Sequence, residues 1–409
     1  MPSAADLSTP RDRADGAVVA AERKVAAVPQ RLRGILSLDD FEVAARRQLP
    51  RPIFGYVSGA TETGAAFAAN RTAFSERAFV PRVLVNVGTR DASCTLFGQR
   101  LSHPFGVAPM GLSALAAYDG DVVLARAAAA AGTFAILSAT SLTRLERVAG
   151  EAGSRWFQAY LPGEAARIEA MLERVAAAGF DTFVLTVDVP VGGNRENNIR
   201  NGFDAPLRPS LRLAFQGITH PRWLVGTALR TLARHGMPHF ENMDAFRGPP
   251  ILSRNLVRAI GKRDQLAWEH VDLIRRRWKG RFVLKGVLSP ADARIAAARG
   301  VDGIIVSNHG GRQLDGAVAP LRMLPDIVAA AGAMPVMLDS GIRRGTDVLK
   351  ALALGAAFVF IGRPFLFAAA VAGEDGVAHA MRILAEEIDR DMALLGARTL
   401  SDLTPDLLL

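Results

Sequence analysis

The chain has very little cysteine, since Cys94 is the only one in 409 residues. A single thiol excludes an intramolecular disulfide and any metal or iron–sulfur site built from several cysteines. We therefore expect Cys94 to be a buried or inert thiol, which fits a cytoplasmic location. We also expect no metal site.

Long apolar runs are absent as well. Half of the residues are hydrophobic, which is enough for a large core. Yet no stretch approaches the roughly 18 consecutive apolar residues of a membrane-spanning helix. The first 33 residues mix charged residues with Ala and Pro and lack the apolar core of a signal peptide. We expect residues 1–35 to be a disordered extension and residues 36–409 to form the folded part.

The net charge of +9 is concentrated in one segment. Residues 200–263 contain eleven Lys and Arg and only three acidic residues, so they carry +8 of it. A basic balance first suggests nucleic acid. However, the segment has no zinc-finger or RNP-type pattern and few aromatics that could stack on bases. We therefore expect no nucleic-acid partner and favour adhesion to an anionic surface.

Within this basic insertion, residues 211–233 interleave Leu, Phe, Ile, Trp and Val with Arg. This pattern is typical of a helix that lies in a membrane interface. A solvated lid over an active site accounts for a long insertion equally well. Both interpretations stay open.

Short apolar runs recur along the chain, and each ends in a polar or glycine-rich turn before an alanine-rich helical stretch. Helices are expected over 120–131, 164–178 and 290–299. The runs are residues 105–110, 134–138, 156–160, 183–188, 282–285, 303–307, 336–339 and 358–362. Eight strands alternating with helices predict an α/β fold, a (β/α)8 TIM barrel with a long insertion after strand 4. A doubly wound open sheet is the alternative, but no Gly-x-Gly-x-x-Gly turn follows an early strand.

The segment 307–316, Ser-Asn-His-Gly-Gly-Arg-Gln-Leu-Asp-Gly, is the most informative part of the chain. It follows the buried run 303–306 directly, so it delivers the imidazole of His309 to the rim of the sheet. Arg312 lies three residues further on. A base and a guanidinium in one loop suit a substrate that has both a removable proton and a carboxylate.

Polar residues also follow the other strands, where TIM barrels gather their chemistry. The last two strands end in Asp-Ser-Gly-Ile-Arg-Arg (339–344) and Gly-Arg-Pro (362–364). Glycine-freed backbone amides beside two arginines predict a phosphate cradle.

The sequence of residues 307–315 resembles the signature of the FMN-dependent (S)-2-hydroxy acid dehydrogenases and oxidases, a family that includes glycolate oxidase, lactate dehydrogenase and mandelate dehydrogenase. The resemblance runs from about Leu36 to the C-terminus. It implies FMN as cofactor and oxidation of a small (S)-2-hydroxy acid to the 2-oxo acid. It also implies a homo-oligomer, a tetramer.

The resemblance assigns roles to individual residues. His309 is the implied catalytic base, Asp188 stabilises its imidazolium, and Tyr160 touches the substrate oxygen. Arg195, Arg312 and Tyr56 are implied to hold the substrate carboxylate. The implied contacts to the flavin ring and ribityl chain are Pro109, Met110, Gly111, Ser138, Gln158, Thr186, Lys285 and Ser307. Those around the ribityl tail and phosphate are Asp339, Ser340, Gly341, Ile342, Arg343, Gly362 and Arg363.

Several features bear on the subclass. Gly111 stands where the oxidases carry Ala, which favours a dehydrogenase that passes electrons to a quinone or a protein acceptor. Residues 187–195, 220–223 and 234–238 look most like mandelate dehydrogenase, a membrane-associated member, so we expect a peripheral enzyme on the cytoplasmic face of the inner membrane. Thr140 falls where some short-chain oxidases have Trp, which leaves room for a larger side chain. An oxidase that makes hydrogen peroxide is the enzymatic alternative, and a membrane-adhesion module on an inactive barrel is the non-enzymatic one. The sequence leaves open whether the substrate's α-hydrogen leaves as a proton or as a hydride.

Overall fold

The computed structural model describes residues 28–153, 155–203, 210–253 and 262–409. Eight parallel strands run in the order β3-β10-β9-β8-β7-β6-β5-β4. A parallel bridge between Val107 and Ala135 joins the two end strands and closes the ring. The strands are β3 (Phe105–Val107), β4 (Ile136–Ser138), β5 (Trp156–Ala159), β6 (Thr182–Thr186), β7 (Arg281–Val287), β8 (Gly303–Val306), β9 (Val336–Leu338) and β10 (Phe358–Ile361). The predicted TIM barrel is confirmed.

Each predicted strand is present because an apolar run with no polar alternation suits a strand covered on both faces. All residues of β3, β4, β5, β6, β8, β9 and β10 are buried. The first strand is shorter than predicted and ends at Val107. Pro109 has no N–H to continue the ladder.

Aromatic side chains fill the inside of the barrel. Trp156, Phe134 and Phe358 stack with centroid distances of 4.6 and 5.4 Å. A hairpin of β1 (Cys94–Leu96) and β2 (Gln99–Leu101) packs on this cluster. Its Phe97 lies 5.7 Å from Trp156, the first residue of β5. The hairpin therefore covers the amino ends of the strands, and the opposite rim is left for chemistry.

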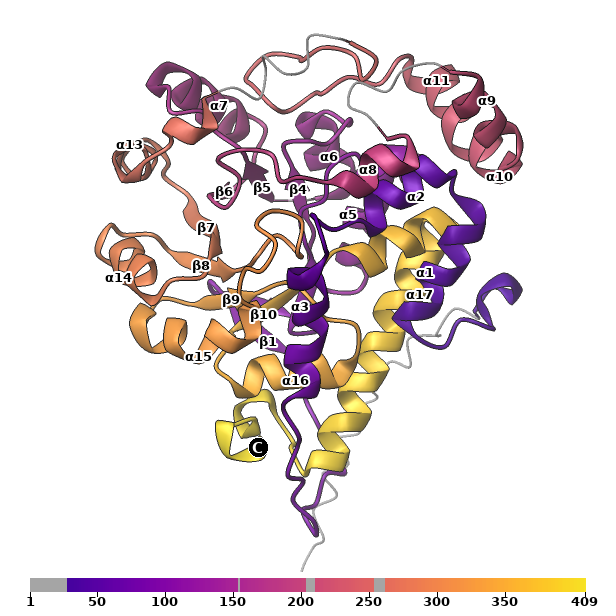
Figure 1. The fold of residues 1–409 in the computed structure, drawn as a ribbon. Helices are drawn as coiled ribbons and strands as arrows, with labels where there is room; N and C mark the ends of the chain where they lie inside the picture. The colour runs from indigo at the N-terminus through magenta and orange to yellow at the C-terminus, as the bar shows by residue number, and fades with distance from the viewer. Residues whose placement is uncertain (1–27, 154, 204–209, 254–261) are drawn as a thin grey trace, which may run out of the picture.

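Helices surround the barrel in the order that the alternating pattern predicts (Figure 1). They are α4 (Ser113–Ala116), α5 (Gly120–Ala130), α6 (Leu145–Ala152), α7 (Ala165–Ala177), α13 (Trp268–Arg277), α14 (Pro290–Ala298), α15 (Pro320–Ala331), α16 (Gly345–Ala353) and α17 (Arg363–Leu395). The three predicted helices, now α5, α7 and α14, are confirmed to within one residue at each end. Helix α17 is kinked at Ala372 and Gly373, whose backbone dihedrals are not helical.

Part of the predicted N-terminal extension belongs to the folded body. Leu32, in the 3-10 turn η1 (Gln30–Leu32), and Ile35 are buried in the main core. The predicted boundary at residue 35 is therefore wrong for residues 28–35, because the side chains of Leu32 and Ile35 pack into the main hydrophobic core. Residues 1–27 of the predicted extension lie outside the described residues. Helices α1 (Leu38–Gln48), α2 (Arg51–Ser58) and α3 (Ala65–Ser75) follow.

The basic insertion lies between β6 and β7, as predicted. Its residues 204–209 and 254–261 lie outside the described residues. The rest contains α8 (Glu196–Asn201), α9 (Leu211–Ile218), α10 (Pro221–Trp223), the π-helical segment η2 (Leu224–Leu229), α11 (Arg230–His235) and η3 (Arg263–Gln265). The stretch 211–233 is helical but interrupted after Ile218, since Pro221 has no N–H to continue α9. Figure 1 shows α9, α10 and α11 at the edge of the molecule, away from the strands.

Two stripes of apolar side chains are exposed on these helices. Leu211, Phe215 and Ile218 follow the i, i+4, i+7 spacing of one helical face and are 92%, 63% and 69% exposed. Val225, Leu229 and Leu232 repeat the spacing and are exposed too. Trp223 points inward instead, and its Nε1 donates to the Leu115 carbonyl at 2.7 Å. Within the described ranges, no helix has the length and apolarity to cross a membrane.

Candidate active site

A cavity of about 510 Å³ opens at the carboxyl ends of the strands. Most of the predicted site residues line its wall. They are Tyr56, Pro109, Met110, Gly111, Tyr160, Thr186, Arg195, Lys285, His309, Arg312, Asp339, Ser340, Gly341, Ile342, Arg343, Gly362 and Arg363. The other four, Ser138, Gln158, Asp188 and Ser307, are buried or half-buried behind that wall and bond to one another or to lining residues. The barrel thus brings distant strand ends together, because parallel strands share one carboxyl edge.

His309 lies between a carboxylate and a phenol. Its Nδ1 is 3.0 Å from Oδ1 of Asp188, and its Nε2 is 3.4 Å from the Tyr160 hydroxyl. An ionised carboxylate can only accept, so Nδ1 carries the proton and Nε2 keeps a free lone pair. The backbone N–H of His309 donates to Oγ of Ser307 at 3.0 Å, which fixes the loop.

Electrostatics keep this imidazole neutral and ready to accept a proton. Burial lowers the pKa of His309 below its ordinary value, although Asp188 opposes that shift. Burial tends to raise the pKa of Asp188, but the charge and hydrogen bond of His309 outweigh burial and hold this pKa low. Burial and the charge of Asp188 raise the pKa of Tyr160 to about 12, so its hydroxyl keeps its proton. The triad therefore offers one base and one neutral donor.

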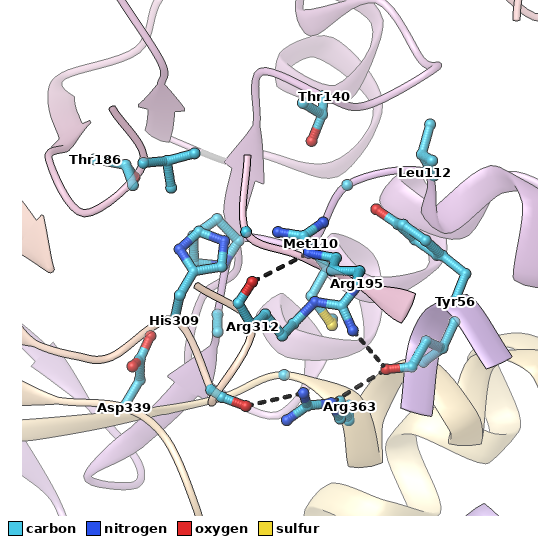
Figure 2. A pocket seen from close by; sticks show the side chains of 18 of the residues that line it. Tyr56, Met110, Leu112, Thr140, Thr186, Arg195, His309, Arg312, Asp339 and Arg363 are labelled. Atoms are coloured by element: carbon cyan, nitrogen blue, oxygen red, sulfur yellow. Dashed lines mark hydrogen bonds between the residues drawn. The ribbon is translucent and has the colours of Figure 1, made fainter. Parts of the chain in front are cut away.

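Two arginines without an acidic partner face the same space. Figure 2 shows Arg195 and Arg312 between His309 and Tyr56. Nε of Arg195 donates to the Arg312 carbonyl at 3.1 Å, and Arg312 donates to the Gly59 carbonyl at 2.8 Å. In the described part of the chain, neither forms an ion pair. Burial and the charge of Arg195 lower the pKa of Arg312 to about 10, so it is still charged at neutral pH. Two such cations create a strong preference for an anion.

Lys285 is a buried cation next to the loop that carries His309. Its Nζ is 2.8 Å from Oδ2 of Asp339 and donates to Oγ of Ser307 at 2.9 Å. Burial opposes its charge, but Asp339 and Asp188 raise the pKa of Lys285 overall. The Lys285 ammonium group is therefore buried and is held in place by Asp339 and Ser307.

The ends of β9 and β10 form the cradle predicted for phosphate. Gly341 has φ +93°, and a Cβ there would lie 2.3 Å from the Asn70 carbonyl, so only glycine fits. The guanidinium of Arg343 is buried, with an ion pair of 3.5 Å to Asp39. Arg363 donates to the carbonyls of Val57, Gly59 and Gly310 at 2.9–3.1 Å. Burial and neighbouring arginines lower its pKa well below the usual range, so this end of the cavity favours a multiply charged anion.

Among the described residues, two buried polar atoms of the predicted flavin contacts have no hydrogen-bond partner. They are Nε2 of Gln158 and Oγ1 of Thr186. A buried polar atom without a partner is costly, so these atoms fit a bound group with its own donors and acceptors. Both belong to the residues predicted to contact a flavin.

Sequence reasoning missed several residues of the site. Gln313 receives a hydrogen bond from Arg195 at 2.9 Å and donates to the Asp188 carbonyl at 3.2 Å, so it ties the arginine to the base. Its place inside the signature was the available signal. Arg263, Phe203, Phe240 and Met243 of the insertion also line the cavity. No local pattern marks them. One part of the insertion therefore lines and covers the site, and another part exposes apolar side chains. The lid and the membrane-interface interpretations are thus compatible.

The profile of FMN-dependent dehydrogenases matches residues 45–409. The chain belongs to this family. The predicted dependence on FMN is confirmed, and the chain is an FMN-dependent dehydrogenase. Across the described residues, no three His, Cys, Asp or Glu side chains form a group that could hold a metal ion.

Known proteins are similar to this chain both in sequence and in structure. An L-lactate dehydrogenase of Ectopseudomonas mendocina is 40% identical over 374 residues, which cover 90% of this chain and 97% of the relative. The monotopic membrane protein (S)-mandelate dehydrogenase is 35% identical with a TM-score of 0.85, covering 92% of this chain and 100% of that one. A mandelate oxidase solved with (S)-2-phenylpropionate is 36% identical with a TM-score of 0.75, covering 91% and 98%.

The residues present fit FMN. The orphaned Gln158 and Thr186 atoms suit the polar edge of a flavin ring, and the Arg343 and Arg363 cradle suits its phosphate. Gly111 keeps the wall flat beside Thr140, because a Cβ there would lie 2.0 Å from the threonine Oγ1. These residues match FMN in their hydrogen-bonding groups, in their charge and in the space that they leave.

Proposed function

We propose that this enzyme oxidises an (S)-2-hydroxy acid to the 2-oxo acid in the cavity at the carboxyl ends of the strands. The observation that carries the proposal is a neutral imidazole, held by Asp188, beside two arginines that lack an acidic partner among the described residues. A 2-hydroxy acid has a carboxylate for the arginines and protons for the base. Both named dehydrogenase relatives act on acids of this class.

In this proposal each side chain has one task. Arg195 and Arg312 bind the substrate carboxylate, helped by the Tyr56 hydroxyl, because a planar guanidinium matches two carboxylate oxygens. This fixes the hydroxyl-bearing carbon near His309. Tyr160, which keeps its proton, donates to the substrate oxygen.

Oxidation removes two electrons and two protons, one from oxygen and one from carbon. FMN, when bound, would accept both electrons and one of the two protons. Whichever bond breaks first, Nε2 of His309 receives one proton, and Asp188 stabilises the imidazolium that results. Lys285 would supply a positive charge that stabilises the negative charge of the reduced cofactor. The residues proposed to hold the ring are Pro109, Met110, Gly111, Ser138, Gln158, Thr186, Lys285 and Ser307, and those proposed for the ribityl tail and phosphate are Asp339 to Arg343, Gly362 and Arg363.

We propose a quinone or a protein as the electron acceptor rather than oxygen. Gly111 supports this, since the oxidases of the family carry Ala there. We also propose that the enzyme binds peripherally to the anionic surface of a membrane, on its cytoplasmic face. The exposed stripes on α9, η2 and α11, set among Arg222, Arg230 and Arg234, support it. A tetrameric state also stays a prediction.

The test of the proposed reaction is anaerobic mixing of the FMN-loaded enzyme with a panel of (S)-2-hydroxy acids that includes lactate and mandelate. We expect loss of the visible absorption band of the oxidised flavin and formation of the 2-oxo acid. The (R)-isomers are the matched control and should leave the band intact. If no (S)-acid bleaches the flavin, or both isomers do so equally, the proposal fails.

A further inference from the structure

Arg263 is a cation of the active-site cavity that pairs with no acidic side chain of the described residues. Of the other lining cations, Lys285 pairs with Asp339 and Arg343 with Asp39. Arg195 and Arg312 face the substrate carboxylate, and Arg363 faces the phosphate cradle. The Arg263 guanidinium, by contrast, forms no hydrogen bond or ion pair with any described residue, although its backbone carbonyl accepts from the Leu266 N–H.

The fold holds this side chain in place. The Arg263 guanidinium lies over the Tyr160 ring, 4.6 Å from its centroid. Its turn is fixed to the loop after β5, because the Gly163 N–H donates to the Lys262 carbonyl at 2.9 Å and Lys262 Nζ pairs with Glu164 at 2.6 Å. A Cβ on Gly163 would lie 2.5 Å from the Gln265 carbonyl, so this close approach requires glycine. The Arg263 side chain is therefore held in a defined position in the wall of the cavity.

Its position differs from that of the carboxylate-binding pair. Burial and the charge of Arg195 lower the pKa of Arg312, whereas burial and the charge of Arg167 lower the pKa of Arg263 and Tyr160 opposes that shift. It lies across the Tyr160 ring, where the cavity adjoins a second one of about 300 Å³. Apolar residues of the insertion and the loop after β6, including Val189, Phe240 and Met243, line the space on the near side. Under the proposed function, a substrate held by its carboxylate at Arg195 and Arg312 would have these apolar residues available for its side chain.

We propose that Arg263 binds a second carboxylate at the far end of the substrate side chain, so that the enzyme prefers 2-hydroxy dicarboxylic acids. This rests on the proposed function. An unpaired guanidinium donor in a partly dry wall gains most from a charged acceptor, and an apolar stretch between two cationic sites matches a short methylene chain between two carboxylates. Arg263 is thus a specificity-determining residue that does not take part in the proton transfer.

The test compares chain-matched substrates. (S)-malate and (S)-2-hydroxyglutarate are set against (S)-2-hydroxybutyrate and (S)-2-hydroxyvalerate, in the FMN-loaded wild type and in Arg263→Met. We expect the wild type to favour the dicarboxylic acids at least about 10-fold in kcat/KM, and Arg263→Met to lose about 10- to 150-fold on these alone, the range for a charged hydrogen bond. Arg276→Met, which removes an exposed cation of α13 outside the cavity, should change neither class.

Product binding gives a readout without turnover. Calorimetry should show tighter binding of 2-oxoglutarate than of 2-oxovalerate to the wild type, and Arg263→Met should abolish the difference. Equal losses on both substrate classes would mean that Arg263 only supports Tyr160, and the proposal would be overturned. Bleaching by monocarboxylic acids without a preference for dicarboxylic ones overturns this inference alone. Absence of bleaching by both classes and also by lactate and mandelate overturns the proposed function itself.

Discussion

The protonation state of His309 is set by two opposing effects of known sign. Burial disfavours the imidazolium and lowers the pKa, and the nearby Asp188 carboxylate raises it, with burial the larger. The base must be neutral to accept a proton. Because a lowered pKa leaves it neutral above that value, kcat/KM is expected to rise with pH and level off, with an apparent pKa below 6.5.

Asp188→Asn is expected to move this limb to still lower pH, since it removes the charge that raises the His309 pKa. It should also reduce kcat by roughly 10²–10⁴-fold, because the imidazolium formed in the reaction loses its partner. A pH series of kcat/KM for both proteins measures this. An apparent pKa that increases in the variant would show that Asp188 does not act on His309 as described.

Individual residues of the site were predictable to the extent that they lie in one short segment or at a strand end. His309, Arg312 and Ser307 share a single signature, and Lys285 and Asp339 end apolar runs. Arg263 could not be found this way, because only the docking of its turn on the loop at Gly163 brings it to Tyr160. Gln313 was visible in the sequence, but its partners were not.

At the scale of elements, the loops after β3 and β4 touch at Gly111 and Thr140. Oγ1 of Thr140 lies 3.0 Å from Oγ of Ser138, which holds its rotamer toward Gly111. Gly111→Ala is therefore expected to strain both loops, at a cost of roughly 1–3 kcal/mol for overpacking. We expect a fall in Tm and weaker FMN retention, both partly restored by adding Thr140→Ala.

The matched control is Gly150→Ala in α6. A Cβ at Gly150 meets nothing within 4 Å, so alanine should leave Tm unchanged or slightly higher. Differential scanning calorimetry with FMN titration reads both effects. A Gly111→Ala protein as stable as the wild type would show that Thr140 turns away without cost.

The exposed stripe on α9 makes a prediction about membranes. Leu211, Phe215 and Ile218 share one face beside basic residues, and burial of a large apolar side chain is worth about 1.5–3 kcal/mol. The wild type should sediment with anionic liposomes at low salt. Replacing all three with Ser should weaken partitioning by at least roughly 30-fold.

Leu84→Ser is the control for that experiment, because Leu84 is 103% exposed but lies outside the insertion. It should sediment like the wild type. If the wild type stays in the supernatant at low salt whatever the lipid, the membrane proposal fails, and the insertion then serves as a cover for the site.

Element types were largely predictable, and their exact form was not. Continuous apolar runs indicated every barrel strand because both strand faces are covered in this fold. The β1–β2 hairpin escaped notice since its three-residue strands carry no such run. The break between α9 and α10 was signalled by Pro221, but tertiary contacts such as Trp223 with Leu115 decide where the next segment goes.

At the scale of the whole molecule, the cavity joins strand ends from all parts of the barrel, so FMN should stabilise the entire fold. Binding to the native state alone adds stability as RT ln(1 + [L]/Kd), about 2.7 kcal/mol at 100 Kd. The Tm of FMN-free protein should therefore rise with FMN concentration. Riboflavin, which lacks the phosphate, should raise it much less if Arg343 and Arg363 form the phosphate cradle. Equal shifts with both ligands would contradict that assignment.

The most direct test of the proposed chemistry is rapid anaerobic mixing of His309→Gln with the best (S)-2-hydroxy acid found for the wild type. The variant should keep its FMN and bind the 2-oxo acid product, since Arg195, Arg312 and the cradle are intact. Flavin bleaching should slow by at least roughly 10²–10⁴-fold. Bleaching within about 10-fold of the wild-type rate would contradict the central claim that His309 is the base.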